Sequence, residues 1–130
     1  ELLEGVVETL GALATRHRLI VVTKGNLDEQ QDKVERSGLR ELFAEVEVLP
    51  EKTAAMYREL VARHGCDPAN TWMIGNSPRS DINPAMAAGV NAVFLPHSFT
   101  WVLEHETVDQ PPQGVHLLEL AKFSQLLEYF

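Results

Sequence analysis

The sequence predicts an α/β fold in which a parallel β-sheet lies between two layers of helices, a three-layer, Rossmann-like arrangement. Two observations lead to this prediction. Stretches with apolar residues at helical spacing alternate with short β-branched runs along the chain. The runs are apolar at successive positions, as is typical of parallel strands buried on both faces. Alternation of strands and helices then places helices on both faces of the sheet.

The first predicted helix covers residues 2–13, where apolar side chains recur every three or four positions, at Leu2, Val6, Leu10 and Leu13. The apolar run at 19–22 is the first predicted strand and ends in the polar sequence Thr-Lys-Gly-Asn. Residues 28–36 are polar and helix-forming, and Gly38 is suited to cap that helix.

The middle of the chain continues the alternation. Alternate valines predict a strand over 46–48, closed by Pro50. Residues 53–64 predict a helix that stops at Gly65, with an apolar face formed by Met56, Leu60 and Val61. Asp67 followed by Pro68 has the pattern of a cap and a first helical position, and predicts a short turn.

The last third contains two more predicted strands, at 72–74 and 92–95, separated by a short helix of small residues at 84–88. Residues 96–114 are irregular, and residues 117–127 predict a terminal amphipathic helix. No repeat or linker divides the chain, so we expect residues 1–130 to form one domain.

Composition excludes several classes of function. The 130 residues carry 11 Lys and Arg against 19 Asp and Glu, a net charge of −8. Such a surface repels nucleic acids and anionic lipids, so we expect neither as a partner. There is no apolar run long enough to span a membrane. The single cysteine, Cys66, cannot form an internal disulfide, which favours a reducing cytoplasmic location.

Unusual polar residues follow three of the four predicted strands. Thr23, Lys24 and Gly25 follow the first, Lys52 comes after the second, and Asn76 and Asp81 follow the third. Ligands of open parallel sheets bind beyond the carboxyl ends of the strands, so these residues should converge.

Each of these residue types suits a phosphorylated ligand. A hydroxyl and the N–H groups of a glycine turn donate hydrogen bonds to phosphoryl oxygens, and a lysine supplies positive charge. Carboxylate and amide oxygens are ligands of Mg²⁺. If the ligand is a phosphate, these residue types have a physical use in binding it together with Mg²⁺.

The run from Val21 to Asn26, then Lys52, then the run from Ile74 to Ile82 together resemble motifs II, III and IV of the haloacid dehalogenase (HAD) superfamily. The resemblance continues through Gly89 and covers most of residues 1–95. It implies a HAD-like core and a Mg²⁺-dependent phosphatase. By position, Thr23 holds a phosphoryl oxygen together with Lys24 and Gly25. Lys52 steadies the nucleophile and the phosphoryl charge, and Asn76 and Asp81 serve the metal.

Two departures from the family pattern limit this expectation. The Asp-x-Asp motif that supplies the family's nucleophile has no counterpart in the chain, and Asn76 stands where the family usually has aspartate. We therefore expect a carboxyl-terminal portion of the enzyme, inactive by itself. The alternative is a non-catalytic binding or regulatory module that kept the fold. Taken alone, each residue also has a structural explanation: Thr23 as a turn hydroxyl, Lys52 as a surface lysine and Asp81 as a helix cap.

The missing motif also has a consequence for the sheet. In the family, its strand is central and lies between the strand ending at Thr23 and the strand ending near Gly75. Without it the core is incomplete, and buried backbone groups would lack partners. We expect the gap to be closed by a separate amino-terminal segment, by a second copy in a homodimer, or by direct pairing of the two flanking strands.

Overall fold

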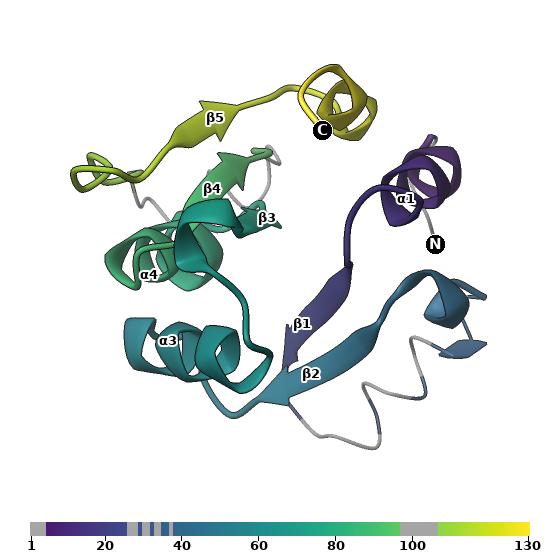
Figure 1. The fold of residues 1–130 in the computed structure, drawn as a ribbon, viewed down its shortest axis with the longest axis horizontal. Coiled ribbons are helices and arrows are strands. Elements are labelled where there is room, and N and C mark those ends of the chain that lie inside the picture. The colour runs from purple at the N-terminus through teal and green to yellow at the C-terminus, as the bar shows by residue number, and fades with distance from the viewer. Residues whose placement is uncertain (1–4, 26–28, 30–31, 33–34, 37, 97–106) are drawn as a thin grey trace. The chain divides into compact units, whose positions relative to one another are not determined.

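The structure, a computed structural model, describes residues 5–25, 29, 32, 35–36, 38–96 and 107–130. The chain divides into two compact units (Figure 1). One consists of Glu1–Glu51 with Lys122–Phe130, and the other of Lys52–Ala121. Among the described residues, no helix has the length and apolar character needed to cross a membrane.

The first unit is built on two parallel strands, β1 and β2. Its elements are α1 (Val6–Ala14), β1 (Ile20–Lys24), the 3₁₀ helix η1 (Arg40–Leu42), β2 (Glu45–Leu49) and the 3₁₀ helix η4 (Phe123–Glu128). The register pairs Ile20 with Glu45 and Lys24 with Leu49. Helix η4 packs against α1, and the side chains of Leu13 and Leu126 are buried. Burial of these leucines accounts for the association of two elements that lie far apart in sequence.

The second unit is built on three parallel strands in the order β3-β4-β5. Its elements are α3 (Ala54–Arg63), the 3₁₀ helix η2 (Pro68–Asn70), β3 (Trp72–Gly75), the π-helical turn η3 (Pro78–Ile82), α4 (Asn83–Ala87), β4 (Asn91–Phe94) and β5 (Leu117–Glu119). Helices α3 and α4 are in contact. The core is formed by Ile82 and Met86 against Ala92 and Phe94 of β4.

Capping residues begin the helical elements of this unit where the sequence predicts. The hydroxyl of Thr53 accepts a hydrogen bond from the Met56 N–H at 3.2 Å and begins α3. The Asp67 carboxylate accepts from the Ala69 N–H at 3.1 Å, with Pro68 at the first position of η2. These side chains satisfy N–H groups that have no partner inside the helix.

The α/β class with parallel strands and flanking helices is confirmed, as are the four predicted strands. Of the helix predicted over residues 28–36, the residues that the structure describes are helical: Glu29, Asp32, Glu35 and Arg36. The remaining residues of that segment lie outside the described ranges.

The terminal helix predicted over residues 117–127 is wrong. Residues Leu117–Glu119 form strand β5, and only Phe123–Glu128 are helical, as a 3₁₀ helix. Strand β5 pairs with β4, with Leu117 opposite Ala92, and the Leu120 N–H continues the ladder by donating to the Phe94 carbonyl at 3.0 Å. Pairing with a buried strand outweighs the local helical pattern.

The two strands expected to flank the family's central strand, β1 and β3, lie in different units. Within the described residues of its own unit, β1 is hydrogen-bonded to β2 and β3 to β4, and each stands at the end of its strand order. All three expected ways of closing the gap, by direct pairing, by a separate segment or by a second copy, stay predictions.

Asn91 provides a test of this packing. Its side chain is 1% exposed. It donates to the Ala69 carbonyl at 2.9 Å and accepts from the His116 N–H at 2.8 Å. We expect Asn91→Ala to lower the free energy of unfolding by about 1–3 kcal/mol, because both backbone groups lose their partner. Urea unfolding followed by circular dichroism measures the change. Asn70→Ala is the control: it removes only an exposed hydrogen bond to the Asp67 carboxylate, 3.0 Å long, and should cost about 0.5 kcal/mol or less.

Candidate active site

The candidate site in the second unit begins where β3 ends. After Gly75 the chain passes through Asn76 and Ser77 into the π-helical turn, which carries Asp81. The N–H groups of Asp81 and Ile82 both donate to the Ser77 carbonyl, at 2.9 and 3.1 Å. The turn is therefore wider than an α-helical one and brings Asp81 back to the strand end.

Gly75 leaves the space that Asp81 occupies. A Cβ atom built on Gly75 would lie 2.6 Å from both Cβ and Cγ of Asp81, closer than real atoms approach. Any side chain at position 75 would displace the carboxyl group. Glycine is required here by close approach.

Lys52 and Asp81 form a partly buried ion pair. The Lys52 Nζ lies 2.9 Å from the Asp81 Oδ1, and the two side chains are 17% and 8% exposed. The second carboxylate oxygen, Oδ2, accepts from the Ser77 N–H at 3.3 Å. The positive charge and the two hydrogen bonds offset the cost of removing the carboxylate from water.

This geometry rules out two of the structural explanations. Lys52 is not a solvated surface lysine, since its ammonium is paired and mostly buried. Asp81 does not cap α4, because the cap position is Ile82 and no side chain caps that helix. Both residues are instead held together, 29 positions apart in sequence.

Two residues that the sequence analysis did not select also belong to the site. Tyr57 of α3 is 3% exposed, and its Oη donates to the Ser80 carbonyl at 2.9 Å. The Ser77 Oγ accepts from the Ser80 N–H at 3.1 Å. Burial, followed by the negative charge of Asp81, raises the pKa of Tyr57 well above its usual value. The signal was present in the sequence: Tyr57 shares the i, i+3, i+4 face of Leu60 and Val61, and a buried tyrosine needs a partner for its hydroxyl.

Asn76 lies at the same strand end and is exposed. Its amide oxygen and the Asp81 carboxylate are oxygen donors of the kind that Mg²⁺ takes. Among the described residues, no three His, Cys, Asp or Glu side chains gather into a metal-binding cluster. Binding of Mg²⁺ by Asn76 and Asp81 stays a prediction.

Thr23, Lys24 and Gly25 belong to the first unit, at the carboxyl end of β1. Thr23 is half-buried and stands opposite Val48, whereas Lys24 is exposed. The Gly25 N–H donates to the Leu49 carbonyl at 3.3 Å, so this N–H, expected to bind phosphate, extends the strand ladder. Gly25 has a φ of 129°, which favours glycine. Their phosphate-binding roles stay predictions.

The close approach at Gly75 leads to a test with a matched control. We expect Gly75→Ala to destabilise the protein by about 1–3 kcal/mol, because the added methyl group forces the Asp81 side chain to move. Gly11→Ala is the control, since Gly11 lies inside α1 with nothing within 4 Å of its Cβ position. That change should stabilise the protein by about 0.5–1 kcal/mol. Urea unfolding of both variants checks the signs, and a neutral Gly75→Ala would contradict the packing described.

Comparisons with known proteins identify the family of the chain. A family model described as haloacid dehalogenase-like hydrolase matches residues 1–95. Glyceraldehyde 3-phosphate phosphatase of Methanothermobacter thermautotrophicus is 32% identical over 117 residues, which cover 86% of this chain and 50% of that protein.

Solved structures give the same result. A haloacid dehalogenase-like family hydrolase from Xanthomonas campestris superimposes with a TM-score of 0.80 at 30% identity, over 96% of this chain and 51% of that one. A 2-haloacid dehalogenase from Pseudomonas syringae gives a TM-score of 0.72 at 26% identity, over 98% and 52%. The chain thus spans about half the length of these relatives. With the family model matched over residues 1–95, the chain belongs to the haloacid dehalogenase-like hydrolase family.

Proposed function

We propose that the protein is a Mg²⁺-dependent phosphatase that acts on a small phosphorylated metabolite. The observation that carries this proposal is the Lys52–Asp81 pair, 2.9 Å long and mostly buried beyond the end of β3. Such a pair fixes one ammonium and one carboxylate at a sheet edge where parallel-sheet proteins bind ligands.

The relatives support a phosphorylated substrate over a haloacid. The relative at 32% identity is named as a phosphatase of glyceraldehyde 3-phosphate. The 2-haloacid dehalogenase is less similar, at 26% identity. A second argument comes from chemistry. A lysine such as Lys52 is suited to the dispersed charge of a phosphoryl group, and a strand-end hydroxyl such as that of Thr23 can donate to a phosphoryl oxygen.

In this proposal Lys52 has two tasks. One of its N–H groups is directed to Asp81, and an ammonium has two more donors. These donors would balance negative charge on the phosphoryl group and on the attacking carboxylate. Thr23, Lys24 and Gly25 would hold phosphoryl oxygens. The chain has no Asp-x-Asp motif, so the nucleophile would come from polypeptide other than these 130 residues.

Mg²⁺ fits the donor atoms of the site but needs more negative charge than the described residues supply. Asn76 contributes a neutral oxygen, and Lys52 compensates the charge of Asp81. The ion would supply positive charge against the phosphoryl oxygens when bound. Its further ligands would be substrate phosphate, water and the missing nucleophile strand, in keeping with the few protein ligands that Mg²⁺ takes. The cytoplasmic location expected from the lone Cys66 stays a prediction.

A test of this function compares the 130-residue chain with a longer protein that joins it to an upstream segment carrying an Asp-x-Asp motif. We expect no metal-dependent phosphate release by the chain alone, because charge stabilisation without a nucleophile leaves the covalent step undone. The longer protein should release phosphate from an aryl phosphate or from glyceraldehyde 3-phosphate in the presence of Mg²⁺.

Three outcomes would contradict parts of this proposal. Turnover by the chain alone that Lys52→Ala abolishes would reveal a nucleophile within these residues. Dehalogenation of a 2-haloacid without phosphate release would show that the proposed substrate class, a phosphorylated metabolite, is wrong. Absence of both activities from the longer protein would favour the alternative of a binding or regulatory module.

A further prediction compares the contributions of the two candidate metal residues, Asp81 and Asn76, to the activity of the longer protein. Asp81→Ala should lower Mg²⁺-dependent activity about 10–100-fold, and Asn76→Ala by a smaller factor. Asp81 carries a full charge and also holds Lys52, whereas Asn76 is neutral and exposed. A Mg²⁺ titration of both variants measures the difference. Equal or reversed losses would remove Asp81 from its assigned role.

A further inference from the structure

Both backbone polar groups of Ser80, the residue before Asp81, are held by side chains. The Ser80 N–H donates to the Ser77 Oγ at 3.1 Å, and the Ser80 carbonyl accepts from the Tyr57 Oη at 2.9 Å. The peptide that links Ser80 to Asp81 is thus held at its carbonyl by Tyr57, from outside the turn, and at its N–H by the Ser77 carbonyl, at 2.9 Å. Within a regular helix, by contrast, such groups are bonded to other backbone groups.

Two side chains, one from just before α3 and one from within it, contact the turn. Lys52, just before the helix, contacts the carboxylate of Asp81, and Tyr57, inside the helix, contacts the backbone one residue earlier. The lysine side chain is long and flexible, so the ion pair alone does not fix the orientation of the Asp81 carboxylate. A buried aromatic side chain has two rotatable bonds and fixes the second contact more tightly.

We propose that Tyr57 is a positioning residue of the active site: its hydroxyl anchors the Ser80 carbonyl and thereby sets the direction in which the Asp81 carboxylate faces Lys52. The inference rests on the proposed phosphatase function. It goes beyond that function by assigning a role to a residue that would touch neither substrate nor metal.

The environment of Tyr57 suits this role. The phenol is buried beside a carboxylate, and both effects raise its pKa. The hydroxyl therefore keeps its proton, and with it the ability to donate, throughout the neutral pH range. A phenylalanine would fill the same space and leave the Ser80 carbonyl without this donor, so Tyr57→Phe isolates the hydrogen bond from the packing.

The experiment measures kcat, KM and amide hydrogen exchange for the longer, active protein and its Tyr57→Phe variant. We expect kcat to fall about fivefold with KM nearly unchanged, the size expected for one lost hydrogen bond that acts on the reacting groups. Exchange of the Asp81 and Ile82 amides should become about fivefold faster. The Ala88 amide, which donates to the Pro84 carbonyl of α4, should exchange as before.

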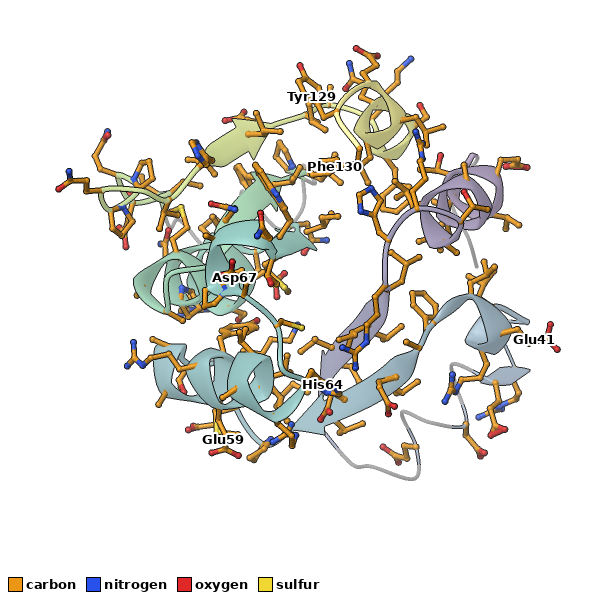
Figure 2. All side chains as sticks on the ribbon, viewed as in Figure 1. Glu41, Glu59, His64, Asp67, Tyr129 and Phe130 are labelled. Carbon is orange, nitrogen blue, oxygen red and sulfur yellow. The ribbon has the colours of Figure 1, made fainter. Side chains whose placement is uncertain are left out.

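Tyr129→Phe is the matched control, because Tyr129 is the only other tyrosine of the chain and is 56% exposed (Figure 2). It should leave kcat and exchange unchanged. A double variant with Asp81→Asn separates positioning from general stability. If Tyr57 acts through Asp81, Tyr57→Phe should cause less than a twofold further loss in the Asp81→Asn background.

Two results would overturn the inference. One is an equal fold-loss of kcat from Tyr57→Phe in both backgrounds, which indicates a role in stability alone. The other is unchanged exchange of the Asp81 and Ile82 amides. If the unsubstituted protein shows no phosphatase activity, the proposed function fails, whereas the exchange measurement still decides whether Tyr57 holds the turn.

Discussion

The burial of one carboxylate, that of Asp81, determines the structure around the end of β3. A charged group removed from water needs compensation, which here comes from the Lys52 ammonium and the Ser77 N–H. It also needs space, which Gly75 provides by having no side chain. The burial of Asp81 thus fixes the relative positions of three parts of the second unit: Lys52 before α3, Gly75 at the end of β3 and the π-helical turn.

The pairing of Asp81 with Lys52 also limits how strongly the site would bind a cation. An aspartate already paired with lysine contributes little net charge, and Asn76 contributes none. A divalent ion at this edge would therefore depend on negative charge that arrives with the substrate phosphate or with another part of the protein. Metal binding and substrate binding would support each other in such a site, because each supplies charge that the other requires.

The sequence is informative where function and fold depend on local patterns. The four strands predicted at 19–22, 46–48, 72–74 and 92–95 are present, because short β-branched runs bounded by turn residues carry their own signal. The order and spacing of the run 21–26, Lys52 and the run 74–82 indicated the family, and the run 74–82 with its continuation through Gly89 was the specific part of the signal. The ion pair itself was not predicted: the sequence analysis assigned Lys52 to the phosphoryl charge and Asp81 to the metal, whereas the structure joins the two.

Features that depend on distant partners were missed. Strand β5 is three residues long and exists by pairing with β4, so its leucines look helical when taken alone. The π-helical turn is also held by the hydrogen bond from Tyr57 to Ser80, which no local pattern predicts, whereas the cap by Ser77 before Pro78 follows the same local pattern as Asp67 and Pro68. In both cases tertiary contacts override the weaker local preference.

The composition of β1 and β3 bears on how the sheets are completed. Exposed edge strands usually carry charges, proline or bulges that prevent further pairing. Strand β1 has the sequence Ile-Val-Val-Thr-Lys, with its one charge at the end, and β3 has Trp-Met-Ile-Gly with none. Both are composed like central strands, yet within the described residues each has a neighbour on one side only. Apolar strands at the end of a strand order favour the addition of another strand, so the composition is consistent with completion by further polypeptide, whether from the same protein or from a second copy.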